Sequence, residues 1–465
     1  MEIQGIAIIF LCVYLLVMIG IGIYGRKYAE SFSDFIDTGK KATLIMLIGT
    51  SLGNHIGGGF VIGGSEYGAQ YGIGGAWFGM ACGIAYLFFS LIAKKVRFMG
   101  AATVSDALAY RYGGKRTRLV FALLNTIGYT GIVASQIFIG GKILSALGMD
   151  PTLGVIATTL IVITYSSFSG LWGAMMTDTI QVITCSIGLV IALIYLLATH
   201  GTAPLAQLDP RNMDFMPFGT MEFLMIILPT SLFGFLSQVT YQRTAAAAND
   251  KIAVSHHWIA GLILLPLAFI PVIIGMYGRA FIPEVESAQA LIMVMLNSVP
   301  PVVGALVIVA IFAALMSTCD GLILGVIAHV MHDIYKHVIG TQASDRTLRR
   351  GSTILLISVG IGALLVALMA NGIVSTLILA YSVVVCGSVV ALLGGVIWKG
   401  ATEAGAFWSM IVGGGTFLLG KFGILPIPYP NVVALLPSIL VFIVVSLMTS
   451  PQVNAKLDQR SNRIG

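Results

Sequence analysis

Apolar runs of about 20 residues recur from one end of the sequence to the other, and short polar segments separate them. A helix of that length crosses the roughly 30 Å hydrocarbon core of a bilayer. We predict about thirteen transmembrane helices, near residues 5–25, 43–71, 75–93, 118–147, 152–169, 177–199, 219–242, 253–278, 297–335, 352–371, 373–397, 403–421 and 431–449. Because no long polar segment lies between them, residues 1–465 are expected to form one all-α polytopic membrane domain.

Two of these apolar runs carry polar residues and glycines near their middle. Residues 51–64 read "SLGNHIGGGFVIGG", and residues 228–243 read "LPTSLFGFLSQVTYQR". A helix in hydrocarbon is interrupted only where its freed backbone groups face protein, water or a ligand. The interrupted runs are the second and the seventh, which fits two repeats of opposite orientation that each open with a broken helix around a midplane site. A tightly packed helix crossing is the alternative for the glycines.

Composition and charge agree with a membrane protein. The chain is 57% hydrophobic and 9% charged, against about 25% charged in soluble domains. With the N-terminus outside, the Lys and Arg residues fall at inner loops and ends, with four exceptions, Lys142, Arg211, Arg279 and Lys421. We therefore predict a multi-pass protein of the inner or plasma membrane with a cytoplasmic tail, residues 450–465. The net charge of +6 follows from this asymmetry, so no nucleic-acid partner is expected. Nothing in the sequence indicates an oligomeric state.

Two acids interrupt other apolar runs and need a partner, a proton or a function. Asp178 lies near the start of one run, so it is alternatively an interfacial acid at a helix N-terminus. Asp320 lies within another run, close to the hydroxyls of Ser317 and Thr318 and the carbonyl of Ala314. Hard oxygen donors of this kind suit an alkali cation. A Ser or Thr in a membrane helix also bonds to its own helix, which is the alternative for this pair.

Three motifs carry a resemblance to a known family: "GLWGAMMTDTIQ" at 170–181, "ALMSTCDGLILG" at 314–325 and "DIYK" at 333–336. Together with the predicted span plan, they resemble the sodium:solute symporter family over nearly the whole chain. The resemblance implies a leucine-transporter-like 5+5 inverted repeat, whose parts are the extra N-terminal helix 5–25, the repeats 43–199 and 219–397, and two C-terminal helices within 403–449.

The resemblance also implies a sodium ion as the coupling ion. Its implied ligands are the carbonyls of Gly53, Ile56 and Ala314 and the hydroxyls of Ser317 and Thr318. Members that bind two sodium ions use an acid matching Asp178, a hydroxyl residue in the broken helix and two serines. This sequence has His55, Asp320 and Gly321 at the last three positions. These departures argue against a second sodium and leave Asp178 and Asp320 as candidates for a second cation or a proton.

Within the family, residues 55–77 and 238–243 resemble choline-type members, which share the triple glycine. His55 and Ser237 stand where those members present aromatic walls, and losing these walls argues against a quaternary ammonium ion. We expect a small polar organic solute, such as an amino acid, a carboxylate or an amine. The candidate solute-binding residues are His55, Gly58, Tyr129, Gln136, Ser237 and Gln238.

Alternatives stay open for three of these candidates. His55 is a hydrogen-bond donor to the solute, a proton carrier or a satisfied packing residue. Tyr129 and Gln136 alternatively form helix–helix hydrogen bonds.

The predicted function is secondary active uptake of the solute with sodium, by alternating access around the two broken helices. A tenfold sodium gradient supplies about 1.4 kcal/mol and 100 mV about 2.3 kcal/mol per charge. A proton-coupled or uncoupled carrier is the main alternative. A cation channel needs rings of carbonyls or acids, and an enzyme needs a nucleophile with its base or a zinc motif. The sequence shows neither pattern, so we predict no enzymatic activity.

Overall fold

A computed structural model describes residues 3–25, 42–99, 103–167, 171–340 and 344–449. In these ranges the chain is helical apart from turns, loops and one isolated bridge between Ala42 and Ala247. The longer helices are α1 (Ile3–Gly25), α3 (Leu44–His55), α4 (Gly64–Tyr71), α5 (Ala76–Met99), α6 (Val104–Tyr112), α7 (Lys115–Ala146), α8 (Pro151–Ser166), α9 (Leu171–His200), α11 (Thr220–Leu236), α12 (Gln238–Ala246), α13 (Asp250–Leu267), α14 (Phe269–Phe281), α15 (Ala290–Asn297), α16 (Pro301–Ile327), α17 (Asp345–Leu368), α18 (Ile373–Ile397), α19 (Glu403–Lys421) and α21 (Leu435–Met448). The shorter ones are η2 (Gly59–Gly63), η3 (Gly72–Gly75), α10 (Ala203–Ala206), η4 (Pro210–Met213), η5 (Ser287–Gln289) and α20 (Pro430–Val433), and η6 (Ala328–Val338) continues α16.

The number of membrane-crossing helices differs from the sequence prediction. Among the described residues, 8 helices are long and apolar enough to cross a bilayer, or 9 if the bent pair α11 and α12 is one span. The count of about thirteen is therefore not confirmed. Several predicted spans form short or broken helices: the run 43–71 is divided into α3, η2 and α4, and α8 has only 16 residues.

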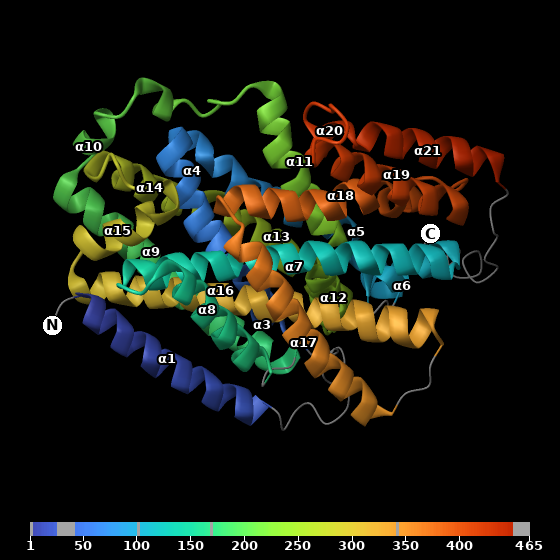
Figure 1. The fold of residues 1–465 in the computed structure, drawn as a ribbon, viewed down its shortest axis with the longest axis horizontal. Helices are drawn as coiled ribbons and strands as arrows, with labels where there is room; N and C mark the ends of the chain where they lie inside the picture. The colour runs from blue at the N-terminus through green and yellow to red at the C-terminus, as the bar shows by residue number, and fades with distance from the viewer. Residues whose placement is uncertain (1–2, 26–41, 100–102, 168–170, 341–343, 450–465) are drawn as a thin grey trace.

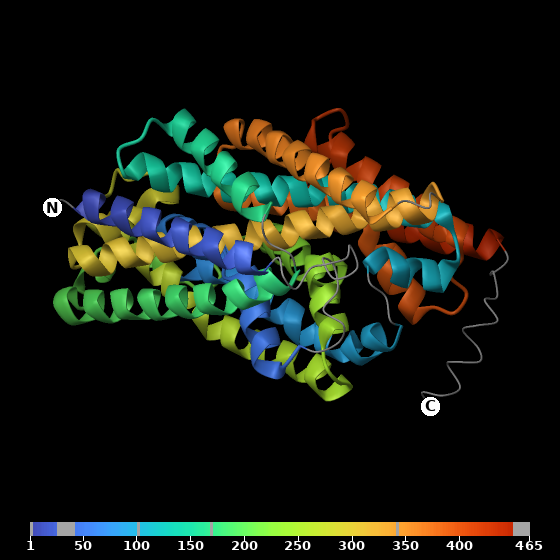
Figure 2. The same ribbon diagram turned by 90° about the horizontal axis from the view of Figure 1, so that it is seen from below.

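The centre of the molecule is built around α16. Of its most apolar stretch, 83% is buried inside the protein, against 28% for α9 and for the span that contains α21. Figures 1 and 2 show α7 and α16 side by side along the long axis, with α1 on the outside of α16. In Figure 1, α1 begins at the left and α21 ends at the right, so the start of the first described helix and the end of the last lie on opposite sides of the molecule.

Both predicted helix interruptions are present. The first helix stops at His55, where Ile56 adopts φ −79° and ψ 51°, and it resumes beyond Gly57 as the π-helical turn η2. The second interruption lies at Ser237, whose extended backbone separates α11 from α12, and the two halves meet at 42°. The Ser237 hydroxyl accepts a hydrogen bond from the Thr240 amide, 3.5 Å away, and so caps α12.

The second half of the first broken helix, α4, is held at α18 by hydrogen bonds. Glu66 on α4 accepts hydrogen bonds from the backbone amides of Ile373, at 3.2 Å, and Val374, at 3.0 Å. These are two of the first amides of α18, which lack partners within their own helix. A carboxylate also interacts favourably with the positive end of the helix dipole.

Candidate functional site

Glycines at the first interruption let two other helices, α16 and α9, approach it closely. A Cβ atom on Gly57 would lie 2.0 Å from Thr318 Oγ1 of α16. On Gly53 it would lie 2.9 Å from the backbone oxygen of Asp178 in α9. Close helix packing at these glycines is compatible with a functional site. The close approach itself brings polar groups of α16 and α9 to the interrupted backbone.

Oxygen atoms of α16 and α3 converge at this interruption. The Ser317 hydroxyl lies 3.5 Å from the Gly53 carbonyl oxygen. The Thr318 hydroxyl lies 3.4 Å from the carbonyl oxygen of Asn54 and 3.2 Å from that of Ala314. Four of the five predicted sodium ligands therefore lie together, and Asn54 is an additional neighbour. Such a set of carbonyl and hydroxyl oxygens suits a hard monovalent cation.

Ile56, the fifth predicted ligand, caps the C-terminus of α3 and is fully buried. Its amide donates to the carbonyl of Leu52, 2.6 Å away. The role of its own carbonyl as a sodium ligand stays a prediction.

Asp178 is buried beside these oxygens, and its partner is Arg243 at the end of α12. Asp178 Oδ1 accepts a hydrogen bond from Ser317, and Oδ2 accepts one from the Thr50 hydroxyl at 2.6 Å. Arg243 Nη2 is 3.4 Å from Asp178 Oδ2, and the two side chains are 2% and 1% exposed. Asp320 is also buried, two residues after Thr318.

The position of Arg243 corrects its assignment to an inner loop. That assignment assumed that the seventh span is one helix that reaches the membrane surface near residue 242. Because α12 restarts after the break at Ser237 and bends away by 42°, its last turn stays inside the protein. In the sequence, the signal for a buried Arg243 is its place directly after an apolar run that polar residues interrupt.

A cavity of about 40 Å³ lies between the two interruptions. It is lined by Asn54, His55, Gly57, Gly59, Phe60, Phe78, Cys82, Ile132, Gln136, Phe233, Ser237, Thr318, Leu322 and Tyr381. The lining contains amides, hydroxyls, an imidazole and aromatic rings, but no Asp, Glu, Lys or Arg. The volume accepts only a few molecules the size of water, so an organic solute needs these side chains to move apart.

Three of the six predicted solute-binding residues line this cavity: His55, Gln136 and Ser237. His55 also packs edge-on against the ring of Tyr86, and its Nδ1 atom lies 3.0 Å from the Tyr86 hydroxyl. Gly58 lies directly against Gln136, because a Cβ atom there would be 2.9 Å from Gln136 Oε1. His55 is thus both a held packing residue and a wall of the cavity.

Tyr129 and Gln238, two other predicted solute-binding residues, are not among the lining residues and instead stabilise the second interruption. The Tyr129 hydroxyl accepts a hydrogen bond of 2.5 Å from the Gln238 amide. The Gln238 side-chain oxygen accepts one of 2.9 Å from the amide of Val104. The helix–helix alternative is therefore the observed role of Tyr129, since an amide freed by a helix break needs a partner inside a membrane.

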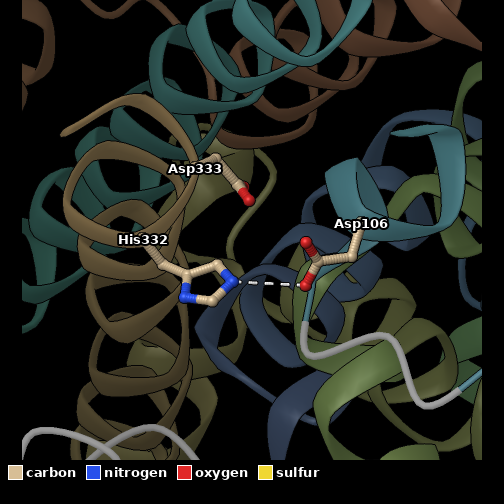
Figure 3. A group of neighbouring side chains, drawn as sticks. All are labelled: Asp106, His332 and Asp333. Atoms are coloured by element: carbon tan, nitrogen blue, oxygen red, sulfur yellow. Dashed lines mark hydrogen bonds and ion pairs between the residues drawn. The ribbon is translucent and has the colours of Figure 1, made fainter. Parts of the chain in front are cut away.

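A separate polar cluster joins α6, the start of α7 and η6 (Figure 3). Ligand atoms of Asp106, His332 and Asp333 all lie within 4.8 Å of one another, a spacing that suits a metal ion. However, Arg118 Nη1 is 2.8 Å from Asp106 Oδ1 and 3.2 Å from Asp333 Oδ1. The guanidinium already supplies the positive charge that a metal would bring, so the cluster is an ion-pair network that ties α6 to η6.

This network predicts an acid-dependent loss of stability through Asp106. Burial raises its pKa, but the hydrogen bond and charge of His332 and the charge of Arg118 lower the pKa further, to a value below its usual range. A depressed pKa stabilises the fold above the unfolded value near 3.9, and the effect is lost as pH falls through the folded value. We expect Asp106→Asn to destabilise the protein by about 1–3 kcal/mol at neutral pH.

Thermal unfolding of wild type and variant in detergent, between pH 7 and pH 3, tests this expectation. The two melting temperatures should differ by a constant amount down to about pH 4 and converge below it. Asp209→Asn is the control, because Asp209 is exposed and only caps a short turn. A difference that persists unchanged at pH 3 would contradict the assignment.

Comparisons with known proteins show which family the sequence matches. The model of the sodium:solute symporter family matches residues 35–413. A sodium/proline symporter of Staphylococcus aureus (strain USA300 / TCH1516) is 25% identical over 481 residues, which cover 95% of this chain and 92% of that protein.

Two solved structures of transporters share the fold. A Na+-coupled sialic acid symporter in a substrate-bound outward-open state superimposes with a TM-score of 0.80, at 17% identity, over 96% of this chain and 98% of that one. Mhp1, a nucleobase-cation-symport-1 family transporter, superimposes with a TM-score of 0.59, at 14% identity, over 89% of this chain and 95% of that one. Both are leucine-transporter-fold proteins, so the predicted fold class is confirmed.

Proposed function

Because this chain belongs to the sodium:solute symporter family, it is a sodium-coupled solute transporter rather than an enzyme, and we propose where it binds its ion and its solute. The sodium ion binds between α3 and α16, at the carbonyls of Gly53, Ile56 and Ala314 and the hydroxyls of Ser317 and Thr318. The observation that carries this proposal is the convergence of both hydroxyls on the carbonyl oxygens of the interrupted helix. An ion there bridges two closely packed helices whose own hydrogen bonds at this point are long, 3.5 and 3.4 Å.

The solute binds in the adjoining cavity and is small, polar and without net charge. In the lining, Asn54, His55 and Gln136 offer hydrogen bonds, and Phe233 and Tyr381 offer aromatic rings. Burying a net charge in a cavity without a charged side chain would be costly. A small amino acid fits best, because its carboxylate is balanced by its own ammonium group. The sodium/proline symporter among the relatives supports this class.

We propose further that the chain belongs to the triple-glycine subgroup but does not carry choline. Residues 55–77 support the subgroup, whereas the imidazole of His55 and the hydroxyl of Ser237 replace aromatic walls. The cavity nevertheless keeps the rings of Phe60, Phe78, Phe233 and Tyr381, which makes it more aromatic than the sequence predicted. A quaternary ammonium ion therefore belongs in the test panel as the competing solute.

The N-terminus lies outside and the C-terminus inside, in the inner or plasma membrane. Basic residues at α6 and at the start of α7 support this orientation, since both lie toward the end of the molecule where α21 ends (Figure 1). Sodium binding then favours an outward-open state that accepts the solute before the protein opens inward.

Thermal stability of the purified protein identifies the solute and tests the coupling together. The panel contains amino acids, carboxylates, amines including choline, and sugars, each in sodium and in potassium buffer. We expect a small amino acid to raise the melting temperature by several degrees in sodium only, since a ligand at 100 times its Kd adds about 2.7 kcal/mol. Equal stabilisation in both buffers, with none from sodium alone, would favour the proton-coupled or uncoupled carrier.

A further inference from the structure

The buried Arg243 meets three other helices beside the proposed sodium ligands. Its Nη2 atom contacts Asp178 Oδ2 of α9 at 3.4 Å, and its Nε atom contacts the Thr50 hydroxyl of α3 at 3.3 Å. On α16, a Cβ atom at Gly321 would lie 3.5 Å from Arg243 Nη2. The guanidinium is therefore enclosed by α3, α9 and α16 and is only 2% exposed.

Asp178 links the guanidinium directly to the proposed ion site. One of its oxygens accepts a hydrogen bond from Ser317, whose hydroxyl also lies 3.5 Å from the Gly53 carbonyl. Its other oxygen contacts Thr50 and Arg243. A single carboxylate thus separates the fixed cation from the place where the transported cation binds.

The opposite charges of Asp178 and Arg243 leave little attraction for another ion at that carboxylate. A buried carboxylate needs a counter-charge, and the guanidinium supplies it permanently because Arg keeps its proton at every physiological pH. A second sodium at Asp178 would have to displace a side chain that is fixed to the protein, or bind against its positive charge.

We propose that Arg243 is a built-in cation that occupies the place of a second sodium at Asp178 and so limits transport to one sodium per solute. The inference rests on the proposed function, because it assumes a sodium ion at Ser317 and Thr318. It makes Arg243 a determinant of the coupling ratio. A purely structural ion pair would change stability and leave the ratio unchanged.

The experiment measures sodium-dependent uptake in proteoliposomes, with the panel solute that binds best, as a sodium Hill coefficient and as a sodium-to-solute flux ratio. For wild type we expect both values to be about 1. Arg243→Gln removes the charge and is expected to raise both toward 2, because Asp178 then takes a second sodium. Arg243→Lys keeps the charge and should stay near 1, as should the Arg243→Gln, Asp178→Asn double variant, which lacks the carboxylate as well.

Arg118→Gln is the matched control, because it removes another buried, ion-paired Arg far from the site and should leave the ratio at 1. A wild-type ratio of 2 would overturn the inference while sodium coupling stands, and so would an Arg243→Gln variant with an unchanged ratio. If Arg243→Gln does not fold, the inference is tested by the flux ratio of wild type and by that of the Arg243→Gln, Asp178→Asn double variant. Uptake by wild type without any need for sodium would overturn the proposed function itself.

Discussion

Replacing Ser317 and Thr318 together by alanine is expected to abolish sodium-dependent uptake. Each hydroxyl is a ligand of the proposed ion, and a contact to a charged group is worth about 1.5–3 kcal/mol. Losing both should lower the apparent sodium affinity at least about 100-fold. Initial rates of solute uptake, measured against sodium concentration in proteoliposomes, test the expectation. The single variant Thr318→Ser, which keeps a hydroxyl at each position, should retain much of the sodium affinity that the double alanine variant loses.

A matched control separates loss of the ion from loss of buried hydroxyls. Thr158 and Thr159 on α8 are adjacent, buried and bonded to carbonyls of their own helix at 2.8 and 2.9 Å. Their double replacement by alanine should leave the sodium dependence unchanged. If the Ser317→Ala, Thr318→Ala variant takes up solute with normal sodium dependence, the ion does not bind between α3 and α16.

Replacing Gly57 by alanine is also expected to impair transport, although it adds only one methyl group. The new Cβ atom would lie 2.0 Å from Thr318 Oγ1 and 3.0 Å from Thr318 Cβ, so α3 and α16 must separate or Thr318 must rotate away. Overpacking of this kind costs about 1–3 kcal/mol of stability. We expect the apparent sodium affinity to fall at least about 10-fold as well, measured by the same uptake assay and by thermal unfolding.

Two further variants make this expectation specific. Gly415 lies on α19, and a Cβ atom there would meet nothing within 4 Å, so Gly415→Ala should be close to neutral. Adding Thr318→Ala to Gly57→Ala removes the closest contact, with Oγ1, and leaves the tight contact of 3.0 Å with Cβ, so stability should recover in part while sodium-dependent uptake stays lost. An unaltered sodium affinity in Gly57→Ala would mean that α3 and α16 tolerate separation at the proposed site.

The sequence carries a strong signal where polarity interrupts hydrocarbon. Residues 51–64 and 228–243 were recognisable because glycines and polar side chains are costly inside a membrane helix without a local reason. Ser317 and Thr318 were recognisable for the same reason. The structure places breaks in both segments and brings these two hydroxyls to the first break.

Other features left no such signal. The rings of Phe60, Phe78, Phe233 and Tyr381 line the cavity, but aromatic residues are common in apolar runs whether or not they meet a ligand. The roles of Tyr129 and Gln238 were ambiguous for another reason. A polar side chain beside a helix break can bind a free backbone amide as readily as it can bind the solute. The predicted number of spans is not confirmed among the described residues, because hydropathy measures apolar length and does not show where a helix stops.

The two halves of the first broken helix are attached to different parts of the protein. The first half, α3, is held at α9 and α16 through Asp178 and Ser317. The second half, α4, is held at α18 through Glu66. Since intact helices resist bending, any relative rotation of these two groups of helices must be absorbed by backbone torsions at Ile56 and Gly57. Mechanical compliance and the proposed ion coordination are therefore properties of the same few peptide units, and a change that stiffens this segment alters both at once.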